Sequence, residues 1–164
     1  MKKNLQWEVK VSINVPVEKV WDATQDISLI PTYHPEVEKV ELLSGNTKRA
    51  PGVEYKCIIP EGRPRSGSCV EKVIENVKYE KTTILAVEDT WGLSEMLKYY
   101  ITEVIFEKKD KNTTILHLLG YYEPNGLKMR IMNILVLRRI MKKRGREVLM
   151  GVKDLVEKNY SNSE

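Results

Sequence analysis

Residues 7–21 read Trp-Glu-Val-Lys-Val-Ser-Ile-Asn-Val-Pro-Val-Glu-Lys-Val-Trp, and this stretch decides the fold. From Trp7 to Val15 apolar residues alternate with polar ones, and this period of two predicts a strand with one face in the core. Pro16 suits the first turn of a helix, and the apolar residues after it recur at helical spacing as far as Trp21. The stretch therefore predicts a strand that leads directly into a short helix over residues 16–25.

The remainder of the chain predicts one more short helix, six more strands and one long helix. Asp26 can cap the second short helix, which we expect to end before Pro31. Apolar alternation separated by turn residues predicts strands over 36–43, 53–59, 67–77, 79–89, 97–108 and 113–123. The long helix spans residue 127 to about residue 159. Because short turns join neighbouring antiparallel strands and a lone long helix must cover one face of their sheet, we expect an α+β fold.

Length and composition are those of one globular domain. The chain has 164 residues and a mass of 19.0 kDa, with 41% hydrophobic and 30% charged residues. We expect one domain over residues 1–160 and a disordered tail over 161–164. The apolar run at residues 134–137 is far shorter than a membrane span, and the first residues lack an apolar signal core, which predicts a cytoplasmic protein. Two cysteines and two histidines argue against a zinc site, and the sequence predicts no metal and no cofactor.

Several local motifs follow one another in an order that occurs in a known superfamily. They are Val15-Pro16-Val17-Glu18-Lys19-Val20-Trp21, then Asp26, Pro31 and Pro35-Glu36-Val37, then Gly52, and finally Tyr122-Glu123-Pro124. Over essentially its whole length the sequence thereby resembles the START-related superfamily (SRPBCC) of polyketide cyclases/dehydrases and plant lipid-binding allergens. One departure is Asn112-Thr113-Thr114, which lacks the glycine of the superfamily's hairpin.

The resemblance implies the helix-grip fold. In this fold a strongly curved antiparallel sheet of about seven strands wraps around the long C-terminal helix and leaves an apolar cavity between them. Members bind lipids, sterols, polyketides or quinones there, and a few catalyse cyclisation or dehydration. The superfamily shares no single catalytic motif, so the resemblance assigns no catalytic residue, and one fold hosts many activities.

Titratable side chains in the predicted strands and loops are candidates for acid–base chemistry. His34 lies in a loop that the resemblance places at the cavity mouth, where it is either a general base or an ordinary surface histidine. His117 is expected to point outward from the last strand. Glu71 and Glu103 lie in mid-strand, where each faces either solvent or the cavity, and a carboxylate in an apolar cavity can act as an acid.

Cysteine and tyrosine supply further candidates on the strands. Cys57 and Cys69 lie directly opposite one another if their turn centres on Arg63, either as a redox pair or as two small buried hydrophobes. Eight of the twelve aromatic residues are tyrosines, and the pairs Tyr99-Tyr100 and Tyr121-Tyr122 should place one ring on each face of the sheet. An inward tyrosine can orient a ligand through its hydroxyl, although tyrosine is also simply common in strands.

The predicted long helix combines two apolar rows with an excess of positive charge. Arg138 falls near the centre of the first row, where it must reach water, an acid or a ligand anion. Residues 127–158 hold ten Lys and Arg and three acids, a net charge of +7 that leaves −3 for the rest of the chain. Apolar and basic residues together favour contact with an anionic membrane, and a homodimer is an equal alternative. The row expected to grip the sheet comprises Leu127, Ile131, Ile134, Leu135, Met141, Gly145, Val148, Leu149, Val152, Leu155 and Val156, and the second row comprises Met129, Met132, Val136 and Ile140.

The leading hypothesis is a non-enzymatic binder or carrier of a hydrophobic small molecule such as a lipid, quinone or polyketide. One alternative is a polyketide cyclase, aromatase or dehydratase that uses acid–base residues in the same cavity. Another is a protein that acts at a membrane or on a partner through the basic helix. Nucleic acid is a poor fit, because aromatic and basic residues do not interleave on the strands. The predicted ligand-binding residues are Leu29, Tyr33, His34, Tyr55, Cys57, Trp91, Tyr100, Leu118, Tyr122, Ile131, Leu135 and Arg138.

Overall fold

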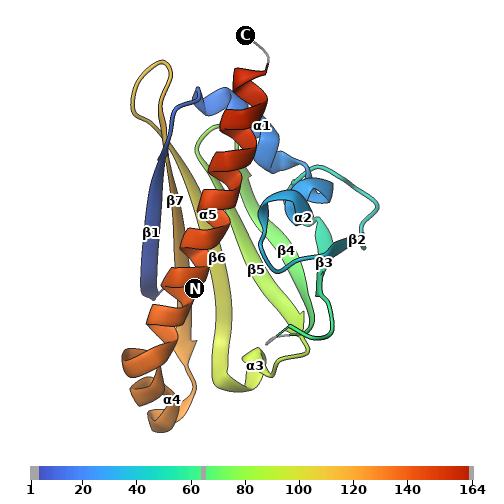
Figure 1. Ribbon diagram of the computed structural model, residues 1–164. Coiled ribbons are helices and arrows are strands. Elements are labelled where there is room, and N and C mark those ends of the chain that lie inside the picture. The colour runs from blue at the N-terminus through green and yellow to red at the C-terminus, as the bar shows by residue number, and fades with distance from the viewer. Residues whose placement is uncertain (1–3, 64–65, 163–164) are drawn as a thin grey trace.

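The computed structural model describes residues 4–63 and 66–162, in which seven strands form one antiparallel sheet (Figure 1). The sheet order is β1-β7-β6-β5-β4-β3-β2, so the first and last strands are neighbours and every other pair is consecutive in sequence. The strands are β1 (Leu5–Ile13), β2 (Lys39–Leu42), β3 (Glu54–Ile59), β4 (Gly67–Val77), β5 (Lys81–Asp89), β6 (Leu97–Lys108) and β7 (Thr114–Pro124).

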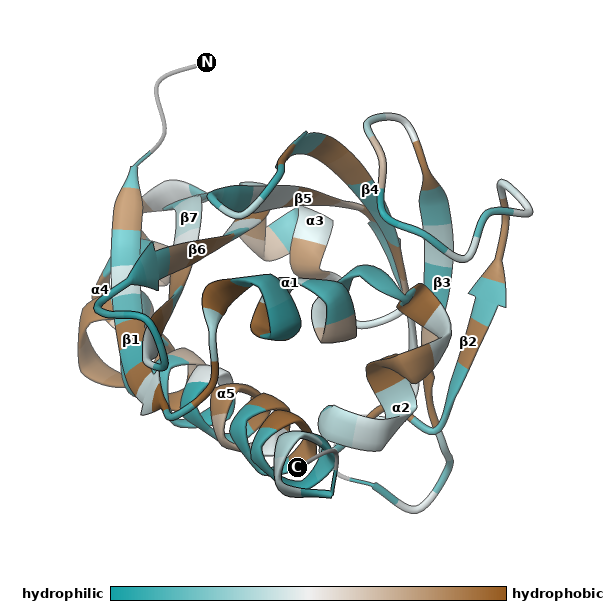
Figure 2. Ribbon diagram, turned by 90° about the horizontal axis from the view of Figure 1, so that it is seen from above, coloured by the Kyte–Doolittle hydropathy of each residue, from teal (hydrophilic) through white to brown (hydrophobic). Residues whose placement is uncertain are grey.

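The helices gather on one side of this sheet. Seen from above, the strands form a curved wall, with α1 inside the curve and α2 and α5 along its open side (Figure 2). This is the predicted α+β helix-grip arrangement. The helical elements are α1 (Val17–Gln25), the 3-10 turn η1 (Ile27–Leu29), α2 (Ile30–Tyr33), α3 (Leu93–Met96), α4 (Gly126–Met132), the π-helical segment η2 (Asn133–Leu137) and α5 (Arg138–Ser161).

Aromatic residues fill the space between the sheet and the helices. Trp7 of β1 is buried between Gly120 of β7 and Gly145 of α5, where a methyl group added at either glycine would overlap the indole. Trp21 of α1 packs edge-on against Phe106 of β6, with 4.9 Å between ring centroids. The core therefore lies on the concave face of the sheet, and the two tryptophans fix α5 and α1 against it.

Most predicted elements are confirmed, and β4 and β6 have the predicted bounds. β5 begins at Lys81 rather than at residue 79, because residues 77–80 form a turn in which Tyr79 adopts a left-handed φ of 64°.

The short helix predicted after Asp26 is confirmed as η1, which ends before Pro31 and whose N-cap Asp26 accepts a hydrogen bond from the Ser28 backbone N–H. A further short helix that the sequence did not predict, α2, follows it directly and includes Pro31. This proline lies in the first turn of α2, where a missing N–H costs no helical hydrogen bond. The sequence pattern did not predict α3. β2 spans Lys39–Leu42 and is shorter than the predicted strand over 36–43.

The C-terminal helix confirms one half of the predicted apolar row and contradicts the other half. In α5, Met141, Gly145, Leu149, Val152 and Val156 are buried as predicted. The predicted packing of the earlier part is wrong, because Leu127, Ile131, Ile134 and Leu135 are 74%, 51%, 64% and 59% exposed. The physical reason is the π-helical segment η2, where an extra residue enters the turn and Asn133 faces inward.

The helix α5 continues to Ser161, so the first residue of the expected tail is helical, and residues 163–164 lie outside the described ranges. Within those ranges no helix combines the length and the apolar character that crossing a bilayer requires.

Candidate functional site

The candidate site lies on the concave face of β3 and β4, where polar side chains face the core. Tyr55 pairs with Glu71 and Cys57 pairs with Cys69, and these four share one face because positions two apart along a strand point the same way. The predicted opposition of the two cysteines is confirmed. Tyr55 and both cysteines are buried, whereas Glu71 is half-buried. Glu71 is therefore the member of this group that a ligand can reach.

Arg49, in the loop before β3, ties this group to the helices. Its guanidinium donates from Nη1 to the Tyr55 hydroxyl at 2.6 Å and from Nη2 to the Tyr33 hydroxyl at 3.4 Å. Its Nε donates at 3.0 Å to the carbonyl oxygen of Thr24, near the C-terminal end of α1, where carbonyls lack helical partners. Arg49 thus joins α1, α2 and β3 at one point. We name Tyr33, Arg49, Tyr55 and Glu71 the concave cluster.

Positive charge in the concave cluster rests on Arg49, and the phenols stay neutral. Burial lowers the pKa of Arg49, but the phenolic oxygens of Tyr55 and Tyr33 together with Glu71 more than offset this, and the pKa is raised. Burial raises the pKa of Tyr33 and raises that of Tyr55 well above its ordinary value, although Arg49 opposes both shifts. The Glu71 side chain also hydrogen-bonds Tyr55 and adds to the rise. Both phenols, which accept hydrogen bonds from Arg49, therefore keep their protons at neutral pH and can also donate.

The two cysteines of this face are free and buried. Burial raises the pKa of Cys57 and of Cys69, and the nearby Glu71 carboxylate adds to both shifts. A thiol that stays protonated is a poor nucleophile and a poor metal ligand, so both cysteines act as small buried hydrophobes. Among the described residues, no three His, Cys, Asp or Glu side chains gather as metal ligands.

A second polar network joins β1 and β7 to η2. The side-chain amide of Asn133 accepts from the Tyr122 hydroxyl at 2.6 Å and donates to Gln6 Oε1 at 2.9 Å. Arg138 donates to the same Gln6 oxygen from Nε at 3.1 Å and from Nη2 at 2.8 Å. Burial raises the pKa of Tyr122 to about 12, although Arg138 opposes the shift. Arg138 therefore bonds a neutral glutamine, which differs from the water, acid or ligand anion that the sequence led us to expect.

The tyrosine pairs place one ring on each face of the sheet, as predicted. Tyr100 and Tyr122 face the core with 5.8 Å between ring centroids. Tyr99 turns outward, and its hydroxyl accepts a hydrogen bond from the Asn4 backbone N–H at 3.1 Å. Leu118 is buried on the core side of β7. With Tyr55 and Cys57 of β3, five predicted ligand-binding residues therefore share the concave face.

Other predicted ligand-binding residues lie farther out. Leu29 in η1 and Trp91 before α3 are partly buried at the edge of the core, and Trp91 Nε1 donates to the Ser66 carbonyl at 3.2 Å. Ile131 and Leu135 are exposed on α4 and η2. The structure does not bring these two residues to the concave cluster.

The outer face of the sheet holds His117 and Glu103. His117 points outward as predicted and lies between two carboxylates, with Nδ1 2.9 Å from Glu8 and Nε2 2.8 Å from Glu107. Glu103 pairs with Leu119, a position that alternates with the inward ones, so it also faces outward. Of the two mid-strand glutamates, Glu71 faces the core and Glu103 does not.

His34 holds the turn that follows α2. Its Nδ1 accepts hydrogen bonds from the backbone N–H groups of Glu36 and Val37, both at 3.2 Å. Burial lowers the pKa of His34 to about 4, with Arg144 adding to the fall and Glu36 opposing it. The neutral ring is therefore an acceptor whose Nδ1 is engaged in the turn.

We expect His34 to reduce stability in acid. Its pKa is about 4 in the folded chain and about 6.5 in an unfolded one, so the unfolded state binds the proton more readily between these values. The contribution is complete above about pH 6.5 and falls by up to about 3 kcal/mol as the pH drops through about 4. Urea unfolding across this range measures the slope. His34→Asn, whose side-chain oxygen can accept the same bonds, should remove this part of the slope, and an unchanged slope would contradict the assignment.

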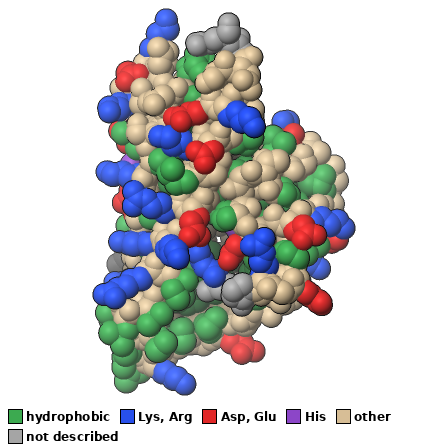
Figure 3. All heavy atoms as spheres, in the orientation of Figure 1, with side chains coloured by type: hydrophobic (Ala, Val, Ile, Leu, Met, Phe, Trp, Pro, Cys, Tyr) green, Lys and Arg blue, Asp and Glu red, His purple; other side chains and the backbone are tan. Residues whose placement is uncertain are grey.

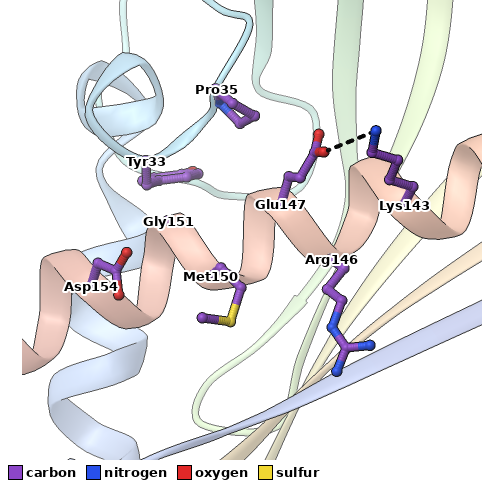
Figure 4. Close-up of a pocket in the computed structure, with 8 residues that line it drawn as sticks. All are labelled: Tyr33, Pro35, Lys143, Arg146, Glu147, Met150, Gly151 and Asp154. Atoms are coloured by element: carbon purple, nitrogen blue, oxygen red, sulfur yellow. Dashed lines mark ion pairs between the residues drawn. The ribbon is translucent and has the colours of Figure 1, made fainter.

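An open pocket of about 470 Å³ lies along the seam between α2 and α5. Figure 4 shows the Tyr33 ring beside Gly151 of α5, and a methyl group at Gly151 would overlap the Tyr33 carbonyl. Tyr33 also reaches Arg49 through its hydroxyl, so this one side chain belongs both to the lining of the pocket and to the concave cluster. The pocket is lined by Tyr33, Pro35, Lys143, Arg146, Glu147, Met150, Gly151 and Asp154.

Some side chains in the middle of the concave face are only half-buried, although this face of the sheet is turned toward the core. Ala86 lies opposite Glu71 and is half-buried. Thr102 lies opposite Gly120 and is also half-buried, as is Tyr100. Figure 3 shows the molecular surface hollowed beside the middle of α5, with acidic and basic side chains around the opening. These half-buried side chains, together with Glu71, keep part of the concave face accessible.

Comparison with known proteins places the chain in one family. The family described as polyketide cyclase/dehydrase and lipid transport matches residues 5–157. A norcoclaurine synthase point mutant from Thalictrum flavum, in complex with a transition-state analogue, has a TM-score of 0.73 at 14% identity, covering 93% of this chain and 94% of that one. The Zhui aromatase/cyclase from Streptomyces sp. R1128 has a TM-score of 0.72 at 15% identity, covering 93% of each chain. No curated protein matches the sequence significantly. At these identities the two structures show a shared fold, and the family match shows that the chain belongs to the polyketide cyclase/dehydrase and lipid transport family.

Proposed function

We propose that the chain binds a small molecule with an apolar body and a hydrogen-bonding group, and that this group meets Glu71 on the concave face. The observation that carries the proposal is the convergence of four residues from four segments, with Glu71 half-buried at the edge of the group. They are Tyr33 of α2, Arg49 of the loop before β3, Tyr55 of β3 and Glu71 of β4. A carboxylate accepts a hydrogen bond from a ligand N–H or O–H. A few polar groups within an apolar lining are the usual composition of a ligand site.

The surroundings of Glu71 suit an apolar ligand body. Ala86 lies directly across the strand pair from it, and Tyr100 and Thr102 continue the half-buried surface along β6. Buried Leu118 and Tyr122 back this surface on β7. Membership of a family of cyclases, dehydrases and lipid-transport proteins supports a hydrophobic ligand.

The same cluster favours a second candidate function, an enzyme of the cyclase or dehydratase type. Acid–base catalysis of this kind needs a base for the substrate proton and a donor for the oxygen on which negative charge develops. Glu71 can take the proton, and the Tyr55 phenol, which hydrogen-bonds Glu71, stays protonated. Arg49 holds both Tyr33 and Tyr55 in place as a positioning residue.

Ligand binding is tested first by native mass spectrometry of the purified chain, with organic extraction of any co-purifying molecule. A titration with N-phenylnaphthylamine, an apolar fluorescent amine whose N–H can donate to Glu71, then locates the site. Ala86→Phe places a ring beside Glu71 and should weaken binding of the probe by about tenfold or more. The control variant Ile74→Phe adds a ring at a 40% exposed position of β4, and it should leave binding of the probe unchanged. Equal binding by Ala86→Phe and the natural chain would place the ligand elsewhere.

The enzymatic candidate is tested separately with nitrobenzisoxazole, whose ring opens when a base removes one carbon-bound proton. If Glu71 is a general base, the natural chain accelerates this reaction and Glu71→Gln reduces the rate by about 10²-fold or more. Tyr33→Phe serves as the matched control, because it keeps the carboxylate and removes one donor. Probe binding without acceleration would leave the binding function standing and remove the enzymatic one.

A further inference from the structure

The first part of the C-terminal helix carries apolar side chains on its outside. Figure 3 shows hydrophobic side chains gathered at the lower end of the molecule in the region of α4. Leu127 is 74% exposed and Ile134 is 64% exposed, which is unusual for a soluble surface when the residues are contiguous. We name this surface the apolar tip. It comprises Leu127, Ile131, Met132, Ile134, Leu135, Val136 and Ile140.

Polarity in this part of the helix is inverted relative to an ordinary surface helix. The side that faces the protein carries Asn133 and Arg138, which are held by Tyr122 of β7 and Gln6 of β1. The solvent-exposed side carries the apolar residues of the tip, with the cations Lys128, Arg130 and Arg139 among them. Four hydrogen bonds therefore anchor the segment with its hydrophobic residues turned out, and packing within this chain does not explain the outward face.

Positive charge surrounds the apolar tip. Residues 126–146 contain eight Lys and Arg and no acid. Arg144 pairs with Glu36 at 3.3 Å and Arg138 bonds Gln6. The other six, Lys128, Arg130, Arg139, Lys142, Lys143 and Arg146, are all exposed, and one of them, Lys143, forms an ion pair with Glu147 at 4.0 Å.

This charge decides between two occupants of the apolar tip. A second copy of the chain, docked symmetrically through the tip, would bring two such cationic clusters together without a carboxylate in either segment to offset them. An anionic lipid surface instead provides an apolar acyl-chain region for the tip and negatively charged headgroups for the six cations. We propose that the apolar tip docks on the surface of an anionic membrane, with the exposed cations at the headgroups.

The test is flotation of the full chain with phosphatidylcholine vesicles, with and without phosphatidylglycerol. The proposal predicts binding to the anionic vesicles, little to the neutral ones, and marked weakening as NaCl rises from about 0.05 to about 0.5 M. Arg139→Gln with Lys142→Gln should weaken binding about 25-fold, at roughly fivefold for each charge removed. Ile134→Gln with Leu135→Gln should weaken it about tenfold or more.

Two control variants match these changes away from the tip. Lys109→Gln with Lys111→Gln removes two exposed charges from the β6–β7 hairpin, and Ile74→Gln removes an exposed apolar side chain from β4. Both should bind as the natural chain does. Equal binding to neutral and anionic vesicles, or no binding to either, would overturn the proposal. So would a dimer in light scattering that Ile134→Gln with Leu135→Gln converts to a monomer, since a second copy would then cover the tip. All variants should retain N-phenylnaphthylamine binding, which separates failure here from failure of the ligand site.

Discussion

Replacing Arg49 with methionine is expected to lower the free energy of unfolding by about 3–5 kcal/mol, as for a buried charge network that loses one partner. The guanidinium donates to Tyr55, Tyr33 and the Thr24 carbonyl, and all three acceptors lose a donor when it is removed. The Glu71 carboxylate also loses the cation near it. Methionine keeps much of the side-chain volume, so the loss reports the polar network and not a cavity. Urea unfolding monitored by circular dichroism measures it.

The neighbouring residue Lys48 gives the matched control. It forms an ion pair with Asp26 at 3.3 Å, but its side chain is 65% exposed. Lys48→Met should therefore cost no more than about 1 kcal/mol. Adding Glu71→Gln to Arg49→Met should recover part of the stability, because the uncompensated carboxylate is then removed. A loss below about 1 kcal/mol for Arg49→Met would mean that water replaces the guanidinium and that the concave cluster is not a closed network.

Local patterns predict the order of the elements because one-sided burial leaves a period in the sequence. The alternation in β1 and the helical spacing after Pro16 are such periods, and they are confirmed. Register could also be predicted where a turn is symmetric. Cys57 lies opposite Cys69 because equal numbers of residues separate them from Arg63. These features depend only on neighbours along the chain.

The apolar row of the C-terminal helix could not be predicted in the same way. Counting at a constant angle per residue assumes a uniform helix, and η2 breaks that assumption at Asn133. Nothing near Asn133 in the sequence marks the change, since its partners Gln6 and Tyr122 lie in β1 and β7. The exposed apolar row is thus a consequence of contacts between distant segments.

The concave cluster could not be predicted from the sequence for a related reason. Glu71 and Tyr55 were candidates, but Arg49 lies in a turn region with no periodic signal, and its partners come from α1, α2 and β3. The only local sign was the position of this cation in the loop between β2 and β3. Charge that is required by tertiary contacts leaves no local pattern, so the residue that organises the site was missed.

Truncating Trp7 to alanine is expected to cost about 3–5 kcal/mol in the free energy of unfolding, because a large core side chain is lost and a cavity remains. The indole is 4% exposed and lies between β7 and α5, against Gly120 and Gly145. Trp91, which is partly buried at the core edge, is the comparison residue. Trp91→Ala should cost clearly less, as judged by urea unfolding of both variants. Equal losses would mean that Trp7 does not fix α5 against the sheet.

A second substitution separates this contact from a general loss of core volume. In the natural chain, a Cβ atom at Gly145 would lie 2.8 Å from the Trp7 ring, so Gly145→Ala should destabilise the fold by forcing α5 outward. In the Trp7→Ala background the indole, which is the nearest obstruction, is gone. The remaining close atom is Val9 Cγ2 at 3.2 Å, which can move by a few tenths of an ångström into the space left by the indole. Alanine is also a better helix former than glycine by about 1 kcal/mol. Gly145→Ala should therefore change sign and become stabilising there. The two single variants and the double variant form a double-mutant cycle. If Gly145→Ala destabilises the fold equally in both backgrounds, the glycine is not needed to accommodate the indole, and the close approach of α5 to the sheet has another cause.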